Sequence, residues 1–345
     1  MEKLIFFYFY LYMDSNFSEH FDADEIKRYL ISIREKTERS YINDVDYSGG
    51  GNGRIFLSRG DVLKVVRISP ASRIYVEREI NVLRNILNCP FIIAYKRHEF
   101  GDDSNLKIYM ELCELGDVGT LAGLFNQLGT PLGIRFMIKM LKDMILALFV
   151  LEKKKILHRD IKLSNIFMKG KQRILSICGK AHKFLDIQFL LGDFGWAKFE
   201  DSLSNTSFGT PNRWPPECNN NPLSYTFKSE IHCLGSAIDE LIQNKENIDS
   251  EFIALIDGMK RENPEERPGL QDLFDELLNI EGKLQLKKMK EINNIYLNTI
   301  NNECKKEPIF NYNNVKSEMD GKMKDLLEVD FNSWTSNNIN NISFE

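Results

Sequence analysis

The chain has 345 residues, of which 43% are hydrophobic and 28% are charged, and its formal net charge at pH 7 is −5. This composition is ordinary for a globular protein, and the length suffices for two lobes and a tail. The slight negative charge gives no general basic field, so nucleic acid is not an expected partner. The six cysteines have no C-x-x-C spacing, which argues against a disulfide framework or a zinc site and favours a cytoplasmic or nuclear location.

Residues 1–40 are expected to form an extension ahead of the main domain. Their apolar and aromatic run from Leu4 to Tyr12 is too short to span a bilayer, which needs ~20 residues. No small-residue cleavage site follows it, so we do not expect membrane attachment, and a signal peptide or anchor is the lesser alternative. Met13 could be the true start, in which case residues 1–12 would be an artefact.

A strand-rich region follows, from about residue 40 to residue 118. Strands are predicted at 54–57 and 62–66, with Gly60-Asp61 as the hairpin turn between them. The segment from Ala71 to Leu87 has apolar residues close to helical spacing and predicts one helix.

Beyond Gly116 the pattern becomes helical. Apolar periodicity predicts helices at 136–151, 230–243, 251–261 and 269–279. The expected fold is therefore α+β, with a small antiparallel-sheet lobe carrying one helix and a larger, mainly helical lobe, together covering residues 41–280. Residues 281–345 form an Asn- and Lys-rich tail, helical at 283–297 and disordered in stretches such as 337–341.

The most specific pattern is the run H-R-D-I-K-L-S-N at residues 158–165, followed by D-F-G at 193–195. The run places an acid, a lysine and an amide at fixed offsets, and the second motif adds another acid. Such a set suits phosphoryl transfer, in which the protein supplies positioning and charge rather than covalent chemistry. A glycine-rich segment at 48–55 could bring backbone amides close to phosphates, although alone it could equally be a flexible loop.

These motifs resemble those of eukaryotic protein kinases of the serine/threonine type. The resemblance implies the bilobal kinase fold, with ATP and Mg²⁺ bound between the lobes. Asp160 would accept or orient the proton of the substrate hydroxyl, and Lys162 would stabilise the transferring phosphoryl group. Asn165 and Asp193 would hold magnesium through oxygen ligands. The spacing of Asp160 and Lys162, and Thr210 within G-T-P, are typical of the serine/threonine type.

The resemblance also implies a nucleotide site in the small lobe. Lys64 would hold the α- and β-phosphates, and we prefer it to Arg67 because a compact ammonium suits the phosphate pocket better than a guanidinium. Glu79 would orient Lys64 from the predicted helix. The positions aligned to the kinase G-x-G-x-x-G-x-V loop are Ser48, which replaces a glycine, Gly50, Gly53 and Ile55.

The connection between the lobes is expected near residues 111–117. By resemblance, Met110 would be the gatekeeper beside the nucleotide. The backbone of Glu111 and Cys113 would pair with adenine, and Asp117 would lie near the ribose.

An activation segment is expected from Asp193 to Glu217, with an ion pair from Glu217 to Arg267 anchoring its end. Thr206 lies where many kinases carry an activating phosphate, and Arg159 is the cation that this phosphate would engage. An upstream kinase acting on Thr206 is thus a candidate partner. The alternative phosphorylation sites are Ser202, Ser204 and Ser207.

Three features depart from the kinase pattern. The spacer from Lys169 to Phe189 is longer than usual and is interpreted as a surface loop. Glu230 stands where kinases have an aspartate that supports the catalytic loop, and its extra methylene puts that support in question. The stretch from Gln243 to Glu251 is short, which puts docking of substrates or regulators in doubt.

Several stretches resemble the NIMA-related group of kinases, with some Aurora-like features. The tail sequence F-N-S-W-T at 331–335 is similar to a hydrophobic motif of AGC-group kinases, although chance is the preferred explanation in an Asn-rich tail. The leading hypothesis is a serine/threonine kinase that transfers the ATP γ-phosphate to hydroxyls of protein substrates. The alternatives are a pseudokinase or scaffold with weak nucleotide binding, and a kinase-like fold acting on a small molecule.

Overall fold

The computed structural model describes residues 45–50, 53–69, 73–86, 89–101, 105–127, 129, 131–177, 180–200, 209–210, 213–219, 224–242 and 248–304, and positions 32, 35, 36 and 39 before them. Side chains are described over the same ranges except within 45–53, at Tyr75, and within 171–186 and 288–304. The chain divides into two compact units, Met1–Gly282 and Lys283–Glu345.

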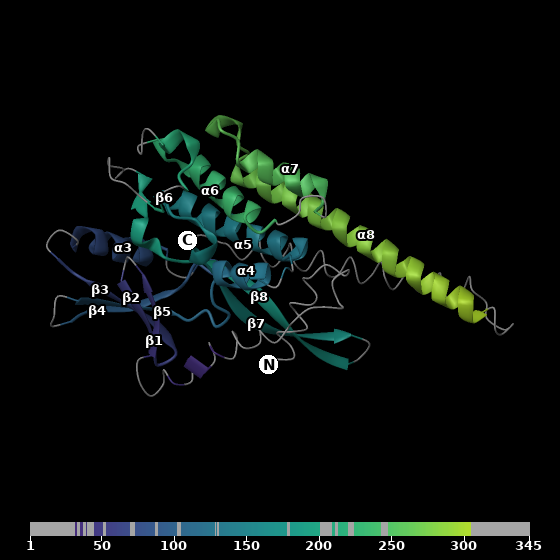
Figure 1. Ribbon diagram of the computed structural model, residues 1–345, viewed down its shortest axis with the longest axis horizontal. Coiled ribbons are helices and arrows are strands. Elements are labelled where there is room, and N and C mark those ends of the chain that lie inside the picture. The colour runs from purple at the N-terminus through teal and green to yellow at the C-terminus, as the bar shows by residue number, and fades with distance from the viewer. Residues whose placement is uncertain are drawn as a thin grey trace. The chain divides into compact units, whose positions relative to one another are not determined.

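The small lobe is built on a five-stranded antiparallel sheet with the order β1-β2-β3-β5-β4. Figure 1 shows this sheet with helix α3 beside it and the helical lobe beyond. The strands and helix are β1 Val45–Gly50, β2 Gly53–Ser58, β3 Asp61–Arg67, α3 Arg73–Asn85, β4 Tyr95–Phe100 and β5 Asn105–Glu111.

The hairpin between β2 and β3 turns at Arg59 and Gly60, one residue earlier than predicted. Both residues have positive φ angles, 51° and 79°, as the twist of a two-residue hairpin requires, and glycine adopts the second at little cost. The predicted helix is confirmed as α3. Its buried Val76, Ile80 and Leu83 recur at helical spacing, which explains why this segment folds as an amphipathic helix.

The large lobe is mainly helical. Its long central helix, α5 (Ile134–Lys153), is buried along most of its length, because its apolar residues cover nearly every face. The other helices are α4 Val118–Gln127, α6 Phe227–Asp239, α7 Ser250–Met259 and α8 Leu270–Cys304. The predicted helices are thus confirmed, and those expected at 269–279 and 283–297 belong to one continuous α8.

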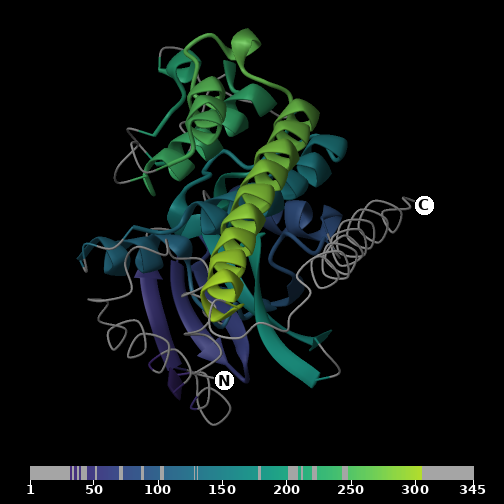
Figure 2. The ribbon, with the colours of Figure 1, turned by 90° about the vertical axis from the view of Figure 1, so that its right-hand side faces the viewer.

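Two two-stranded sheets complete this lobe. One pairs β6 (Ile156–Leu157) with β9 (Lys198–Phe199), and the other pairs β7 (Ile166–Ile177) with β8 (Lys180–Leu191). The second is a long ribbon, visible in Figure 2 beside the five-stranded sheet. Its antiparallel register is unbroken from the pair Ile166–Leu191 to the pair Ile177–Lys180.

The interpretation of residues 169–189 as a surface loop is therefore wrong. The segment is a regular β-ribbon, and its runs of Ile, Leu and Phe supply the strand propensity that favours this outcome. The predictions for residues 1–12, for Thr206 and its neighbouring serines, and for the tail at 331–335 and 337–341 lie outside the described residues. Within the described part of the chain, no helix is both long enough and apolar enough to cross a membrane.

Candidate active site

Lys64 lies at the centre of a buried charge cluster between the lobes. Its Nζ is 2.6 Å from Oε1 of Glu79 and 3.2 Å from Oδ1 of Asp193. Lys64 is only 4% exposed and Glu79 only 6%, so the charges stabilise each other in place of water. Burial opposes the lysine's charge, but the Glu79 and Asp193 carboxylates outweigh it and raise the pKa of Lys64. Arg67, the alternative candidate, is exposed at the end of β3.

Asp193 enters this cluster through an unusual backbone conformation. Its φ of 58° and ψ of 75° place it in the left-handed region, which is uncommon for residues other than glycine and concentrates at functional sites. Burial raises the pKa of Asp193, but the interaction with Lys64 exceeds this effect and lowers it overall. The carboxylate is therefore charged at neutral pH.

The catalytic-loop residues form a second cluster around Asp160. Oδ2 of Asp160 accepts hydrogen bonds from Nζ of Lys162 at 2.8 Å and from Nδ2 of Asn165 at 3.0 Å. Oδ1 of Asp160 accepts hydrogen bonds from the backbone N–H and the hydroxyl of Thr210, each at 2.9 Å. The Thr210 hydroxyl also accepts a hydrogen bond from Lys162 at 2.8 Å. An acid, a cation and Thr210 of the activation segment are thereby fixed at one point.

Gly209 makes this close approach possible. Its φ is +58°, and a Cβ atom there would lie 2.4 Å from the carbonyl oxygen of Arg159. Any other residue would both strain the backbone and push Thr210 away from Asp160.

His158 packs beneath these residues as a core histidine. Its Nδ1 accepts a hydrogen bond from the backbone N–H of Asp160 at 3.3 Å, so Nε2 carries the proton and donates to the Gly192 carbonyl at 3.0 Å. Its ring makes an edge-on contact with Phe194, with centroids 4.8 Å apart. Burial lowers the pKa of His158, in keeping with a neutral ring.

The oxygen atoms at this site suit a magnesium ion. Asn165 uses its Nδ2 to donate to the Asp160 carbonyl at 2.8 Å as well as to the Asp160 carboxylate, which leaves the carboxamide oxygen as its ligand atom. Together with the charged Asp193 it would provide the oxygen ligands that Mg²⁺ prefers. The described residues contain no group of three or more His, Cys, Asp or Glu able to hold a metal unaided. Such a pair is typical of sites where phosphates complete the coordination.

Glu230 supports the catalytic loop despite its extra length. Its Oε1 accepts hydrogen bonds from the backbone N–H groups of His158 at 2.5 Å and Arg159 at 3.0 Å. Its Oε2 accepts a 2.8 Å hydrogen bond from the Tyr225 hydroxyl. The doubt raised by Glu230 is thus resolved, because the longer side chain still reaches both amides and Tyr225 satisfies its second oxygen.

The predicted ion pair at the end of the activation segment is confirmed. The guanidinium of Arg267 donates to both oxygens of Glu217, at 2.8 and 2.7 Å, and Ser229 donates to Oε1 of Glu217 at 2.6 Å. Burial opposes the carboxylate's charge, but the hydrogen bonds from Arg267 and Ser229 outweigh it and lower the pKa of Glu217. This bidentate pair anchors the segment to the large lobe.

The described residues of the predicted glycine-rich loop belong to β1 and β2. Ile55 pairs with both Ser48 on β1 and Lys64 on β3. These three residues therefore lie side by side across the sheet, which places the predicted loop next to the lysine. Gly50 pairs with Gly53 at the tip.

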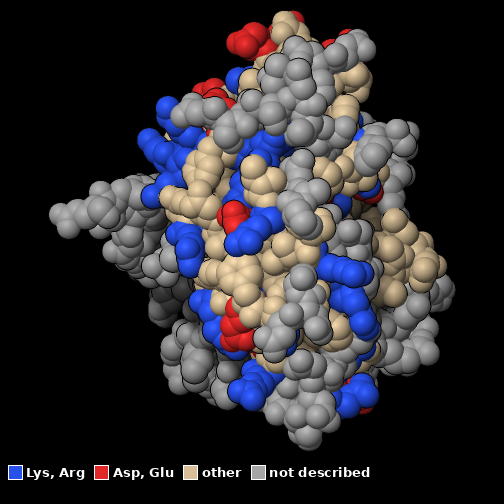
Figure 3. Space-filling model, turned by 90° about the vertical axis from the view of Figure 1, so that its left-hand side faces the viewer, with Lys and Arg blue, Asp and Glu red and all other residues tan. Residues whose placement is uncertain are grey.

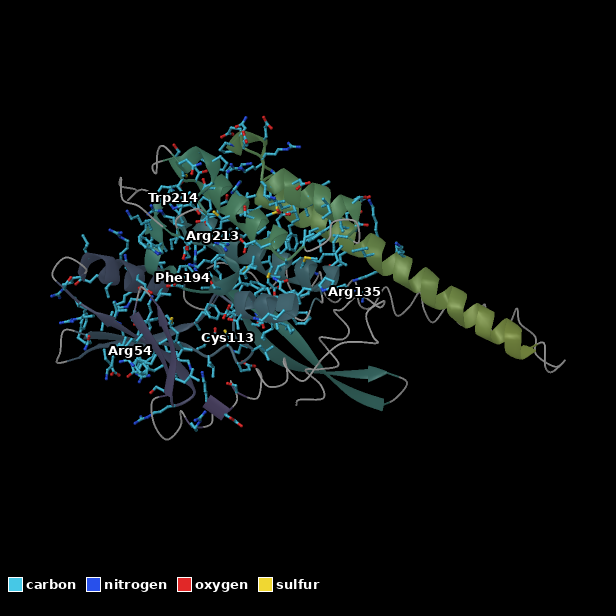
Figure 4. The ribbon with its side chains drawn as sticks, viewed as in Figure 1. Arg54, Cys113, Arg135, Phe194, Arg213 and Trp214 are labelled. Carbon is cyan, nitrogen blue, oxygen red and sulfur yellow. The ribbon has the colours of Figure 1, made fainter. Side chains whose placement is uncertain are left out.

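The connection between the lobes begins at the end of β5. Cys113 is buried with Ile93 and Leu190, and Met110 packs against the same group. Figure 4 shows Cys113 at the junction of the sheet and the helical lobe, and Phe194 near α3. Asp117 caps α4, since its carboxylate accepts hydrogen bonds from the Thr120 amide and hydroxyl, each at 2.8 Å. A structural role of Asp117 is thus visible in addition to the expected one near the ribose.

Arg159 belongs to a cluster of cations that the sequence did not reveal. Lys198 on β9 is 3% exposed, and burial, reinforced by Arg159 and by Arg78 of α3, lowers its pKa to about 8. Lys and Arg are spread more widely than Asp and Glu over the face shown in Figure 3. Like Tyr225, Arg78 and Lys198 have no motif of their own, because they meet only when α3, β9 and the catalytic loop come together.

Comparison with known proteins identifies the family. The model of the protein kinase domain matches residues 61–246, and the chain belongs to the protein kinase family. The fold is the expected bilobal kinase fold. The chain is 30% identical to mouse serine/threonine-protein kinase Nek1, over 62% of this chain and 18% of Nek1. It is also 30% identical to human serine/threonine-protein kinase Nek2, over 47% of this chain and 35% of Nek2.

A probable serine/threonine-protein kinase of Dictyostelium discoideum is 27% identical over 67% of this chain and 56% of its own length. The matches to Nek1 and Nek2 confirm the resemblance to the NIMA-related group. The chain spans less than two thirds of the length of each of these three relatives.

Proposed function

We propose that this chain is an active serine/threonine protein kinase that uses ATP and Mg²⁺. The observation that carries the proposal is the simultaneous contact of Lys64 with Glu79 and Asp193. In protein kinases the lysine–glutamate pair and the metal-binding aspartate must both be in place for transfer. Here one ammonium joins them, so the arrangement is that of an assembled site.

The chemistry divides among residues with distinct tasks. Lys64 neutralises the α- and β-phosphates of ATP, while Asn165 and Asp193 hold magnesium, which supplies charge neutralisation at the phosphate oxygens. The hydroxyl oxygen of the substrate attacks the γ-phosphorus, the bond to the β-phosphate oxygen breaks, and ADP leaves. Asp160 takes the hydroxyl proton. Lys162, which forms an ion pair with Asp160, stabilises the charge on the transferred group.

The protein substrate is expected to lie on the activation segment. Thr210 contacts both Asp160 and Lys162, and the Glu217–Arg267 pair anchors the segment behind it. A segment held this way offers a platform for a peptide beside the catalytic acid, which favours a protein substrate over a small molecule. The pseudokinase alternative loses one of its supports, because Glu230 still holds the catalytic loop.

We also propose control by phosphorylation, by an upstream kinase acting on Thr206. Arg159, Arg78 and Lys198 lie close enough together to shift the pKa of Lys198, and such a cluster would attract a phosphate carrying nearly two negative charges. Binding there would tie the activation segment to both α3 and the catalytic loop. A cytoplasmic or nuclear location is consistent with the scattered cysteines.

The test is transfer of labelled phosphate from ATP to a generic basic protein in the presence of magnesium. Wild type is expected to label the substrate, and Asp160→Asn is expected to lower the rate by about 10²-fold or more because it removes the proton acceptor. ADP binding should survive in the variant. Equal labelling by both proteins, or labelling by neither, would overturn the proposal.

A further inference from the structure

The base of the β7–β8 ribbon contacts two segments of the chain: the connection between the lobes, and the segment of the small lobe between α3 and β4. Lys169 and Gln188 face each other across the ribbon as a cross-strand pair. Lys169 Nζ lies 2.6 Å from Oε2 of Glu111, at the start of the connection between the lobes. Gln188 Nε2 donates to the carbonyl oxygen of Pro90, in the segment between α3 and β4. One residue pair therefore reaches both the connection between the lobes and the α3–β4 segment.

Glu111 closes these contacts into a ring. While its Oε2 accepts from Lys169, its Oε1 accepts a 2.7 Å hydrogen bond from the backbone N–H of Ala94. The backbone N–H of Glu111 in turn donates to the Ala94 carbonyl at 2.9 Å. Ala94 belongs to the same segment as Pro90, so the ring runs from Lys169 through Glu111 and Ala94 to Pro90 and back through Gln188.

Further bonds hold the same backbone at both sides of the ribbon. On the β7 side, the Gly170 amide donates to Oε1 of Glu114 at 3.0 Å, and Met168 exchanges backbone hydrogen bonds with Leu115 and Gly116 at 3.2 and 2.8 Å. On the β8 side, Leu191 bonds to the backbone of Phe91 and Ile93 at 2.9 and 3.0 Å. The position of residues 111–116 is thus determined largely by the ribbon base.

The electrostatics of the ring agree with this geometry. The Lys169 side chain is 36% exposed and that of Glu111 is 16% exposed. The hydrogen bond to Glu111 raises the pKa of Lys169, so the lysine is charged at neutral pH. A partly buried carboxylate that lost this cation would retain only the Ala94 amide and would tend to turn towards water.

We propose that Lys169 is a positioning residue for the nucleotide, acting through Glu111 on the backbone between the lobes. The inference rests on the proposed function, in which the backbone of Glu111 and Cys113 pairs with adenine. A displacement of that backbone weakens nucleotide binding but leaves Asp160, Lys162 and Asp193 in place. Loss of Lys169 therefore raises the KM for ATP and leaves kcat unchanged.

The experiment compares Lys169→Met, Lys169→Arg, Glu111→Gln and the Lys169→Met/Glu111→Gln double variant. Lys169→Met and Glu111→Gln are each expected to raise the KM for ATP and the Kd of Mg·ADP by about threefold to tenfold, as loss of a half-buried ion pair would. The double variant should show a KM and a Kd no higher than those of the more affected single variant, because both substitutions break the same Lys169–Glu111 ion pair. Lys169→Arg should restore most of the affinity.

Lys260→Met is the matched control, because Lys260 also forms a half-buried ion pair, with Asp239, and lies within the large lobe. It should leave both the KM for ATP and the Kd of Mg·ADP within about twofold of wild type. Partial misfolding of Lys169→Met would lower the apparent kcat and leave the KM unchanged. It can therefore be distinguished from the proposed effect, which raises the KM and leaves kcat unchanged.

An unchanged KM in Lys169→Met, or additive effects in the double variant, would overturn the inference. If wild type transfers no phosphate, the proposed function fails, and the Kd of Mg·ADP still decides the role of Lys169. Absence of ADP binding to wild type would overturn both.

Discussion

The hydroxyl of Tyr225 donates a 2.8 Å hydrogen bond to Oε2 of Glu230, and both side chains are buried. The other oxygen of Glu230 holds the backbone of the catalytic loop. Tyr225 therefore fixes the glutamate in the pose from which it supports His158 and Arg159. The substitution of glutamate for the usual aspartate is accommodated by this added contact.

Tyr225→Phe is expected to weaken both stability and catalysis. The change removes a hydrogen-bond donor from a buried carboxylate, which costs about 1–3 kcal/mol in the free energy of unfolding. Because Glu230 then holds the loop less firmly, kcat should fall while the KM for ATP stays near the wild-type value. Chemical denaturation and steady-state kinetics measure the two effects. Wild-type behaviour in both assays would show that the contact does not matter.

Glu230 also predicts a dependence of stability on pH. Burial raises its pKa to about 7, against the opposing hydrogen bonds from Arg159, Tyr225 and His158. The folded state therefore binds more protons than the unfolded state between the ordinary carboxyl pKa and pH 7. By linkage, this contribution to stability is complete at low pH and is lost as the pH rises through 7.

Glu230→Gln removes this titration. Between pH 5 and pH 8, wild type should lose about 1–3 kcal/mol of unfolding free energy more than the variant does. Denaturant titrations at the two pH values measure the difference. Parallel pH profiles for the two proteins would contradict the assignment.

Lys64 and Arg67 can be separated by the same substitution at each position. Lys64→Met leaves Glu79 and Asp193 without the cation that joins them, and it should lower kcat/KM by about 10²-fold or more. Arg67→Met should stay within about twofold of wild type, because Arg67 is exposed outside this cluster. Initial rates at several ATP concentrations give both values. A loss in Arg67→Met that equals the loss in Lys64→Met would reject the choice of Lys64.

Thr206→Ala should lower the activity of the purified, phosphorylated protein by about tenfold, because the cation cluster then lacks its phosphate. Lys198→Met should lower the gain from phosphorylation without affecting the unphosphorylated protein. Mass spectrometry establishes the phosphorylated residue before each assay. Full activity in Thr206→Ala would move the prediction to Ser202, Ser204 or Ser207.

The grouping of the candidate catalytic residues could be predicted because they lie close together in the sequence. Asp160, Lys162 and Asn165 occupy one short run, and a short loop fixes their relative positions almost regardless of the rest of the fold. Predicting that Lys64 and Glu79 meet required only that a strand be followed by a helix, because Lys64 lies on β3 and Glu79 on α3, the next element. Helices α5, α6, α7 and α8 of the large lobe were likewise predictable, since their apolar periodicity is a local property, whereas α4 was not predicted.

Other contacts depend on packing that no local pattern encodes. Lys169 and Glu111 meet only because β7 packs beside the connection between the lobes. From the sequence alone, both would be expected to be solvent-exposed charged residues. The length of Glu230 suggests a poor fit when the sequence is considered alone, because the sequence does not show that the Tyr225 hydroxyl lies within hydrogen-bonding distance of its second oxygen. The sequence at 169–189 favours a loop because its polar residues interrupt the apolar pattern of the two strands.

The most direct test identifies the amino acid that receives phosphate. Wild type and Asp160→Asn are incubated with Mg·ATP and a peptide mixture that presents serine, threonine and tyrosine in matched contexts, and the products are mapped by mass spectrometry. The account predicts phosphoserine and phosphothreonine with wild type and a loss of about 10²-fold or more with Asp160→Asn. Phosphotyrosine as the main product, or equal phosphorylation by both proteins, would contradict it.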